Sequence, residues 1–336
     1  MKKIKIAFIG FNKNSHALPI FKTLERLNDV FEIVGYHLPC GEREKFPDKV
    51  AALNGLPELT LEEIMENPEI EAVAVETEEI YLTKYATIAA EHGKHIHMEK
   101  PGGVSLSAFE ELISAVKASG KVFSTGYMYR HNPEIIKLLE DVREGKLGEI
   151  ISVEAQMNCI HPESVRSWLE AFPGGMMFFL GCHLIDLILL IQGMPKRVIP
   201  MNRSSGVEGV SADDFGMALL EYDRGVSFAK TSAVEIGGYM RRQLVVSGTK
   251  KTVELKPLEA LPKDSCGYSY PMYTGVAEYS SQGWRVAPES RDSITFDRYE
   301  NMLLAFAAYV RGERENPYTP DYELELFKVL LAACGK

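Results

Sequence analysis

The sequence predicts an α/β protein, with a doubly wound parallel sheet in its N-terminal part and a second α/β domain built on an open, mainly antiparallel sheet. Strand and helix signals alternate throughout residues 1–126, whereas turns of the hairpin type separate the strand-like segments that follow. With 336 residues, 46% of them hydrophobic, the chain is long enough to bury the cores of two domains. We therefore expect one domain at residues 1–126 and a second at residues 127–336.

The N-terminal part opens with a strand, a loop and a helix. The apolar run at residues 3–10 ends on Gly10, and apolar residues recur at helical spacing between Ala17 and Leu27. The same pattern repeats, with expected strands at residues 31–36, 72–75, 95–98 and 122–126 and expected helices at 61–65, 85–91 and 105–119. Such repetition is typical of a parallel sheet with helices on both faces.

After residue 127 the pattern changes to strands joined by short turns. Expected strands lie at residues 150–157, 198–203, 214–222, 226–234, 242–247 and 252–255. Expected helices lie at residues 134–144, 176–192, 298–311 and 322–333. Strands linked by hairpin turns predict a mainly antiparallel sheet.

Charge and cysteine content narrow the class of function. The formal net charge of −10 argues against nucleic acid and anionic membranes as partners, because both need a basic surface. No apolar run approaches a membrane span, and the N-terminus lacks the features of a signal peptide, so we expect a cytoplasmic protein. The five cysteines have no metal-type spacing, so we expect reduced thiols and no metal site.

The first candidate for chemistry is Glu99-Lys100-Pro101. The expected strand at residues 95–98 delivers Lys100 to the carboxyl end of the parallel sheet, where open α/β sheets bind their ligands. Pro101 sets the exit direction of the chain, and Gly102 and Gly103 allow a close approach of the backbone. Taken alone, the motif is also compatible with an ordinary surface ion pair.

The turn after the first strand resembles a damaged phosphate-binding loop. The usual pattern is G-x-G-x-x-G, and the chain reads Gly10-Phe11-Asn12-Lys13-Asn14-Ser15. Asn12 tolerates a positive φ, the start of the following helix offers amides to phosphate oxygens, and Lys13 supplies a counter-charge. An ordinary strand-to-helix turn stays open as the alternative.

The ends of the next two strands also depart from a nucleotide-binding pattern. Leu38 stands where an acid would bind the adenine ribose of NAD, while Arg43 and Lys45 could meet the 2′-phosphate of NADP or simply face solvent. After the third strand, Glu78 and Glu79 could accept hydroxyl groups or could repel a pyrophosphate. The choice between NAD and NADP stays open.

A second candidate lies in the expected helix at residues 176–192. His183 and Asp186 are one helical turn apart and therefore share a face. A histidine in a cleft can act as a general acid or base, whereas a core histidine hydrogen-bonded to Asp186 is the alternative.

These motifs, in this order and spacing, resemble the glucose-fructose oxidoreductase and inositol dehydrogenase (Gfo/Idh/MocA) family. The resemblance covers essentially the whole chain, through the Gly10 turn, Thr77, Gly93-Lys94-His95, Glu99-Lys100-Pro101, Arg130-x-Asn132-Pro133, Leu147-Gly148-Glu149-Ile150, Gly174-Gly175 and His183-x-x-Asp186. It implies a Rossmann domain at residues 1–126 and a substrate-binding and oligomerisation domain at 127–336. It also implies an NAD- or NADP-dependent oxidoreductase acting on a CH–OH group of a sugar, cyclitol or glycoside-like small molecule, as a homodimer or homotetramer through the C-terminal sheet.

The resemblance also implies roles for single residues. Lys100 and His183 would be catalytic, with Lys100 stabilising the substrate oxygen and His183 accepting its proton. The cofactor would contact Gly10, Asn12, Lys13, Asn14, Thr77, Glu99, Lys100, Pro101 and Arg130. The substrate would contact Lys100, Phe179, His183 and Asp186.

Phe179 stands where sugar-oxidising members of that family carry an aspartate, which favours a substrate with an apolar or aromatic portion. Together with the changes at Asn12, Ser15, Leu38, Glu78 and Glu79, it raises two alternatives. One is a non-catalytic ligand sensor or scaffold on the same fold. The other is a reductase acting on an imine or enone.

Overall fold

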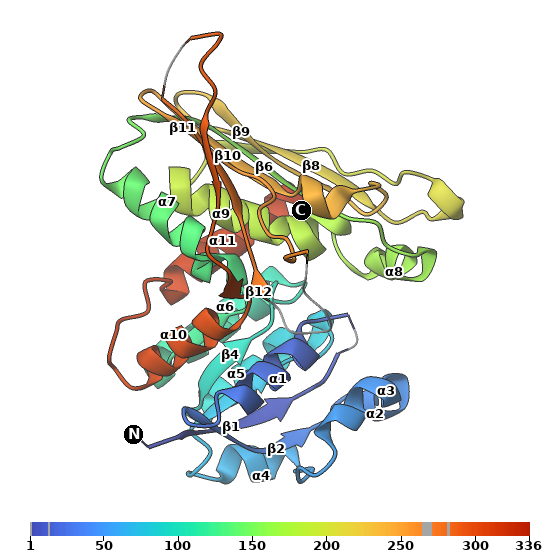
Figure 1. The fold of residues 1–336 in the computed structure, drawn as a ribbon. Helices are drawn as coiled ribbons and strands as arrows, with labels where there is room; N and C mark the ends of the chain where they lie inside the picture. Colours follow the sequence, from blue (N-terminus) through green and yellow to red (C-terminus); the bar gives the residue numbers. More distant parts are fainter. Residues whose placement is uncertain (1, 13, 264–270, 281–282) are drawn as a thin grey trace. The chain divides into compact units, whose positions relative to one another are not determined.

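The computed structural model describes residues 2–12, 14–263, 271–280 and 283–336 (Figure 1). Contacts between Cα atoms divide the chain into two compact units. The first unit combines Met1–Tyr127 with Tyr299–Phe327, and the second combines Met128–Arg298 with Lys328–Lys336.

The first unit is built on a parallel sheet of five strands in the order β2-β1-β3-β4-β5. Its strands are β1 (Ile4–Ile9), β2 (Phe31–His37), β3 (Ala72–Val75), β4 (His95–Met98) and β5 (Phe123–Thr125). Its helices are α1 (Ala17–Arg26), α2 (Glu42–Lys45), α3 (Pro47–Val50), α4 (Leu61–Glu66), α5 (Leu82–Glu91), α6 (Leu106–Ser119) and α10 (Glu300–Val310). The predicted doubly wound sheet is confirmed, and its central strands are mostly buried because helices cover both faces.

The segment Tyr299–Phe327 belongs to the first unit, although the sequence analysis assigned it to the second domain. In α10 the ring of Phe306 lies 5.8 Å from that of His97 on β4. After α10, the guanidinium of Arg311 donates to the carbonyl oxygens of Lys2 and Val30. These contacts are between residues far apart in the sequence, which local apolar spacing does not reveal.

The second unit is built on an eight-stranded sheet in the order β14-β13-β11-β10-β6-β9-β8-β7. Its strands are β6 (Ile150–Asn158), β7 (Arg197–Pro200), β8 (Phe215–Glu221), β9 (Val226–Ser232), β10 (Gln243–Gly248), β11 (Thr252–Leu255), β13 (Gly275–Tyr279) and β14 (Glu289–Asp292). A separate two-stranded sheet pairs β12 (Pro271–Met272) with β15 (Phe296–Asp297). Neighbouring strands of the large sheet run antiparallel except β6 and β9, which are parallel, so the predicted mainly antiparallel sheet is confirmed.

Three helices of the second unit are α7 (Pro133–Arg143), α8 (Glu163–Trp168) and α9 (Cys182–Gln192), while α11 (Pro320–Ala333) is divided between the two units. The expected single helix at residues 176–192 is in fact a π-helical turn, Met177–Gly181, followed by α9. Strand β14 was not predicted because its residues, Glu-Ser-Arg-Asp, are polar and exposed and show no apolar alternation.

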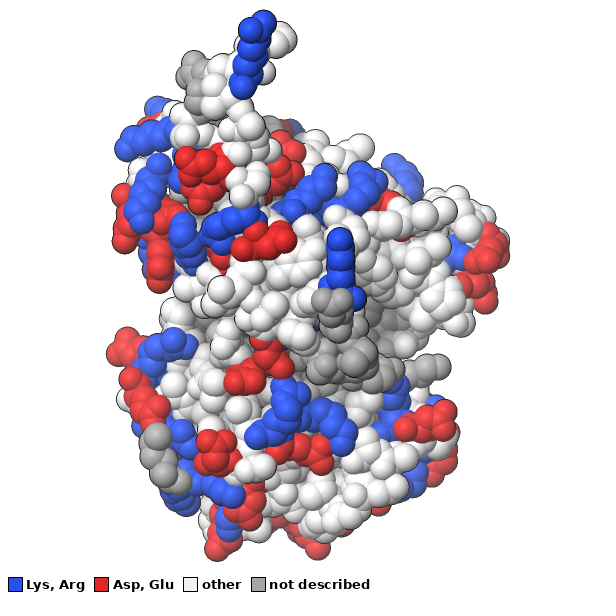
Figure 2. Space-filling model, viewed as in Figure 1, with Lys and Arg blue, Asp and Glu red and all other residues white. Residues whose placement is uncertain are grey.

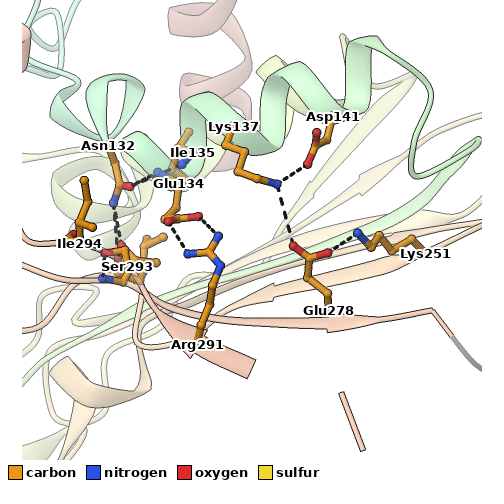
Figure 3. A network of polar contacts seen from close by, with 12 residues as sticks. Asn132, Glu134, Ile135, Lys137, Asp141, Lys251, Glu278, Arg291, Ser293 and Ile294 are labelled. Carbon is orange, nitrogen blue, oxygen red and sulfur yellow. Dashed lines mark hydrogen bonds and ion pairs between the residues drawn. The ribbon is translucent and has the colours of Figure 1, made fainter. Parts of the chain in front are cut away.

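Polar contacts fasten α7 to the edge of the large sheet (Figure 3). Asn132 caps the helix by accepting from the backbone N–H of Glu134, and its amide donates to Thr274 Oγ1 at 3.0 Å. The Glu134 carboxylate receives two hydrogen bonds from Arg291 of β14, at 2.7 and 2.6 Å. This network ties Arg130-x-Asn132-Pro133 to the second unit.

The surface carries both signs of charge. On the face shown in Figure 2, acidic side chains lie between the basic ones. Within the described ranges, no helix combines the length and the apolarity that crossing a membrane requires. The four cysteines that the structure describes are free, and Cys266 lies outside the described residues.

Candidate functional site

The turn after β1 keeps the one glycine that its geometry requires. Gly10 has a φ of +85°, and a Cβ there would lie 2.5 Å from the Cα of Thr77. Only glycine therefore allows the loop after β3 to approach the turn this closely. Gly10 and Thr77, both predicted to contact the cofactor, therefore lie against each other at the carboxyl ends of β1 and β3.

Asn12 acts through its side chain and not through a positive φ. Among the described residues other than glycine, positive φ angles occur at Cys40 and Glu208, so Asn12 does not adopt the positive φ that an asparagine tolerates. The Asn12 side chain accepts from the N–H of Asn14 at 3.1 Å and donates to Glu79 Oε2 at 2.9 Å. The turn is thus closed by an asparagine side chain where the usual loop needs a second glycine.

The rest of this turn leads into α1. Ser15 donates to the carbonyl of Asn12 and accepts from the N–H of Ala17, the first residue of the helix. Lys13, expected to supply a counter-charge, lies outside the described residues.

A buried ion pair follows β4. Lys100 and Glu99 are each 2% exposed, and Lys100 Nζ lies 4.0 Å from Glu99 Oε1. His16 Nδ1 lies 3.1 Å from the same oxygen. Burial alone would raise the pKa of Glu99, but the His16 and Lys100 side chains hold it below its usual value. Glu99 is therefore a carboxylate at neutral pH, as expected for a group that positions an ammonium.

The chain leaves this pair through a cis Lys100–Pro101 peptide bond and then passes close to α6. A Cβ on Gly102 would lie 2.1 Å from the ring of Phe109, so the close backbone approach predicted for this glycine is confirmed.

Three further glutamates are buried at the same edge of the sheet, at positions 42, 76 and 79. Burial raises the pKa of Glu79 to about 8. Burial, followed by the nearby Glu99, raises the pKa of Glu76 well above its usual value. At neutral pH Glu79 is thus mainly a neutral acid, and neutral acids do not repel a pyrophosphate. Glu78 instead reaches outward to Lys45, at 2.7 Å.

Glu42 is the functional candidate that the sequence analysis missed. Its carboxylate is buried, and it accepts from the backbone N–H of Phe11 at 2.6 Å and of Glu78 at 3.2 Å. Cys40 and Gly41, with φ angles of 59° and 72°, reverse the direction of the chain after β2 and so place Glu42 in this buried position. The Pro-Cys-Gly sequence before it was the available signal for such a turn.

The two cations beside Glu42 are held by protein acids. Arg43 donates to Tyr36 Oη at 3.2 Å and pairs with Glu58, and Lys45 pairs with Glu78. Arg43 and Lys45 are thus engaged in ion pairs. These pairs compete with the two expected roles, exposure to solvent and contact with the 2′-phosphate of NADP.

In the second unit, Arg130 and Asp186 bind each other. The Arg130 Nε and Nη2 atoms donate to the two Asp186 oxygens at 2.9 and 2.8 Å, and both side chains are almost fully buried. This bidentate geometry is the strongest form of an Arg–carboxylate contact. Arg130 was predicted to contact the cofactor and Asp186 the substrate, and their mutual ion pair was not foreseen.

His183 lies one turn from Asp186 on α9 and is 1% exposed. Its ring meets the ring of Tyr129 edge-on, with centroids 5.0 Å apart. The Tyr129 hydroxyl donates to Glu259 Oε1 at 2.5 Å, and burial raises the pKa of Tyr129 to about 12. His183 thus packs against a tyrosine that stays protonated. Tyr129 was not among the site residues predicted from the sequence.

Glu259 is shared by two arginines. Arg242 donates to it at 2.7 Å, and Arg298 adds two hydrogen bonds. Burial alone would raise the pKa of Glu259, but the charges of Arg298 and Arg242 hold it below its usual value. The Tyr129 hydroxyl is therefore anchored on a permanent carboxylate.

Phe179 lies in the π-helical turn that precedes α9 and is 8% exposed. The Trp168 ring meets it edge-on at 5.2 Å, and His161 lies 6.4 Å away. Phe179 thus belongs to an aromatic cluster.

The Arg130–Asp186 pair supports a stability prediction. Changing Asp186 to asparagine leaves the buried guanidinium without a carboxylate, so the free energy of unfolding should fall by about 3–5 kcal/mol. Denaturant unfolding measures this change. As a control, Asp321→Asn breaks the exposed Lys117–Asp321 pair and should cost about 0–1 kcal/mol. Equal losses in the two variants would contradict the prediction.

The first unit fits a bound dinucleotide. At position 10 any side chain would clash with Thr77, and α1 begins at the adjoining turn. The strand order reverses between β1 and β3, and doubly wound sheets bind nucleotides at such a reversal. Fold and site thus define a dinucleotide-binding protein with a second, mixed α/β unit.

The family follows from comparison with known proteins. Residues 4–127 match the model of the oxidoreductase family with an NAD-binding Rossmann fold, and residues 135–254 match the GFO/IDH/MocA C-terminal domain. The chain belongs to the Gfo/Idh/MocA oxidoreductase family, and it is an NAD(P)-dependent oxidoreductase.

Relatives span most of the chain at low identity. An uncharacterised oxidoreductase, ORF334 of Rhizobium meliloti, is 26% identical over 81% of this chain and 79% of its own length. The NADP⁺-dependent scyllo-inositol 2-dehydrogenase IolW of Bacillus subtilis is 28% identical over 53% of this chain and 48% of its own. A putative NADPH-dependent oxidoreductase from Desulfitobacterium hafniense has the same fold, with a TM-score of 0.80, 19% identity, and coverage of 100% of this chain and 95% of the other.

Proposed function

We propose that the protein transfers a hydride between the nicotinamide of NAD(P) and a hydroxyl or carbonyl carbon of a sugar, cyclitol or glycoside-like substrate. The single observation that carries the proposal is the buried Glu99–Lys100 pair at the carboxyl end of β4. A buried ammonium is costly and is typical of a functional site. The family membership of both units supports the same reaction class.

The residues divide the chemistry as follows. The nicotinamide, when bound, accepts or supplies the hydride. Lys100 donates a hydrogen bond to the substrate oxygen and stabilises the negative charge that develops there, while Glu99 and His16 position the ammonium. In oxidation His183 accepts the hydroxyl proton, and in reduction it returns that proton.

Two observations narrow the substrate. The relative IolW is named for an inositol, a ring bearing adjacent hydroxyls. In this chain Phe179 and Trp168 provide aromatic surface where an acid is usual, which favours an apolar or aromatic portion beside the hydroxyl-bearing ring. We also propose that the open face of the large sheet joins two or four copies of the chain, which light scattering would test.

A titration with cofactor tests the function. Protein fluorescence followed during addition of NADH and of NADPH should saturate with at least one of them, and a panel of inositols, aldoses and aryl glycosides should then reveal turnover by absorbance at the nicotinamide band. No binding of either cofactor at millimolar concentration would favour a non-catalytic sensor. Turnover of imines or enones alone would favour the reductase alternative.

We infer that Glu42 takes the role of the acid missing at position 38 and makes NAD the preferred cofactor. Glu42 follows β2, and its carboxylate bridges the turn after β1 and the loop after β3, the two segments beside which a doubly wound sheet holds the adenosine ribose. A carboxylate there accepts from ribose hydroxyls and repels a 2′-phosphate.

The change Glu42→Gln should weaken NADH binding by about tenfold and strengthen NADPH binding relative to it, because a charged acceptor is replaced by a neutral one. Burial raises the pKa of Glu42 to about 7, so wild-type affinity for NADH should fall as the pH drops through that value, when the carboxyl gains a proton. The variant should lose this pH dependence. Fluorescence titrations between pH 6 and 8 measure both effects, and an unchanged NADH to NADPH ratio would contradict the assignment.

A further inference from the structure

A cavity lies in the first unit, at the opposite end of its sheet from Gly10 and Lys100. It has a volume of about 430 Å³, and its lining includes Ile4 at the start of β1 and His95 at the start of β4. All strands of this sheet are parallel, so these amino ends share one edge and the dinucleotide edge is the other. The cavity is therefore separate from the proposed redox site.

The lining of this cavity is basic, although the protein as a whole is acidic. Its basic residues are Lys2, His92, Lys94, His95, Lys121 and Arg311. Glu71 is the one acid among the lining residues, and it pairs with Lys2. Three lysines and an arginine thus face a single carboxylate, in a chain whose net charge is −10.

Two of these cations are held in place by backbone oxygens. Lys94 is buried, and its ammonium donates to the carbonyls of Asn67 at 2.7 Å and Ile70 at 2.9 Å. Arg311 donates to the carbonyls of Lys2 and Val30. Carbonyl oxygens position these groups without cancelling their charge, so the positive potential of the cavity persists.

The pKa values of two lining residues, Lys94 and His95, are lowered in part by the positive charge of Lys121. Burial lowers the pKa of Lys94; the charge of Glu66 opposes this in part, and the charge of Lys121 adds a smaller lowering effect. Burial, followed by the charge of Lys121, lowers the pKa of His95 to about 4. His95 Nδ1 accepts from the N–H of Val122 at 3.1 Å, so Nε2 carries the ring proton and is a donor.

We propose that this cavity binds a small phosphate monoester, such as a sugar phosphate, as a second ligand. Its volume lies within the range of small-molecule sites. Lysines held as point charges suit phosphate, and a dianion offsets more of the excess positive charge than a monocarboxylate does. His95 Nε2 adds a neutral donor to the same lining.

Calorimetric titration with ribose 5-phosphate at low salt tests this proposal, with ribose as the uncharged comparison. Lys121 is exposed, so Lys121→Glu should fold normally, and it should weaken binding by about tenfold or more, because a cation at the ligand becomes an anion. Lys121→Met should cause a smaller loss. The matched control, Lys22→Glu, changes an exposed lysine of α1 outside the cavity and should bind as the wild type does.

Three outcomes would overturn the proposal. The first is the absence of binding to the wild type at millimolar concentration. The second is equal affinity in Lys121→Glu and Lys22→Glu. The third is complete displacement of ribose 5-phosphate by saturating NADH or NADPH, which would place the phosphate at the dinucleotide edge. Binding that persists with cofactor present and is lost in Lys121→Glu would support it, whether or not the protein turns over a sugar.

Discussion

Lys100→Met should lower kcat/KM by a factor of about 10²–10³, the usual effect of removing one preorganised donor to a developing oxyanion. Methionine matches the length of the lysine stem but cannot donate a hydrogen bond or carry charge. Because the ammonium acts most strongly on the transition state, the loss should fall mainly on kcat. Steady-state kinetics with the substrate found in the panel measures this effect.

A folding control accompanies Lys100→Met. Removing the ammonium leaves Glu99 buried with His16 still at 3.1 Å but without Lys100, so instability could be mistaken for lost catalysis. The double variant Glu99→Gln, Lys100→Met removes both charges, and thermal melting should show it folded and equally inactive. Wild-type kcat in a folded Lys100→Met variant would exclude a catalytic role for this lysine.

His183→Asn should lower kcat by a factor of about 10²–10⁴, since the hydroxyl proton then has no positioned acceptor. Asparagine is small enough for the same buried position and does not titrate. The pH profile of kcat/KM for oxidation should therefore lose its acidic limb, which reports an essential base. Initial rates across pH 5 to 9 would show this loss.

Tyr129→Phe is the matched control for His183→Asn. It keeps the ring that packs on His183 but removes the hydroxyl bond to Glu259. If Tyr129 only positions the imidazole, the variant should keep the acidic limb of the profile and lose far less activity than His183→Asn. A folded His183→Asn variant with an unchanged pH profile would show that another group accepts the proton.

Local patterns in the sequence were sufficient for much of the fold. The apolar run at residues 72–75 predicted β3 because strands covered on both faces are rich in apolar residues, and the short segment 95–98 before the charged Glu99-Lys100 predicted β4. Ser105 predicted the start of α6, where its hydroxyl accepts from the N–H of Ala108. The order of the motifs also predicted the family, which the two matched domain models show.

Other features depended on contacts that no local pattern records. Glu42 stands beside Arg43 in a charged stretch of the sequence, yet a turn with two positive φ angles buries it against the amides of Phe11 and Glu78. The ion pair of Arg130 and Asp186 joins residues 56 positions apart. In each case a polar group finds its partner only after the chain has folded back.

The sequence by itself determined the class of fold, the family and the strand end that carries Glu99 and Lys100, because apolar periodicity and motif spacing are local properties. Only the tertiary structure decided that Tyr299–Phe327 returns to the first unit, that burial raises the pKa of Glu76 and Glu79, and that a basic cavity lies at the amino edge of its sheet. The physical reason is that burial, pKa and electrostatic potential depend on every group nearby in space, whatever its distance along the chain.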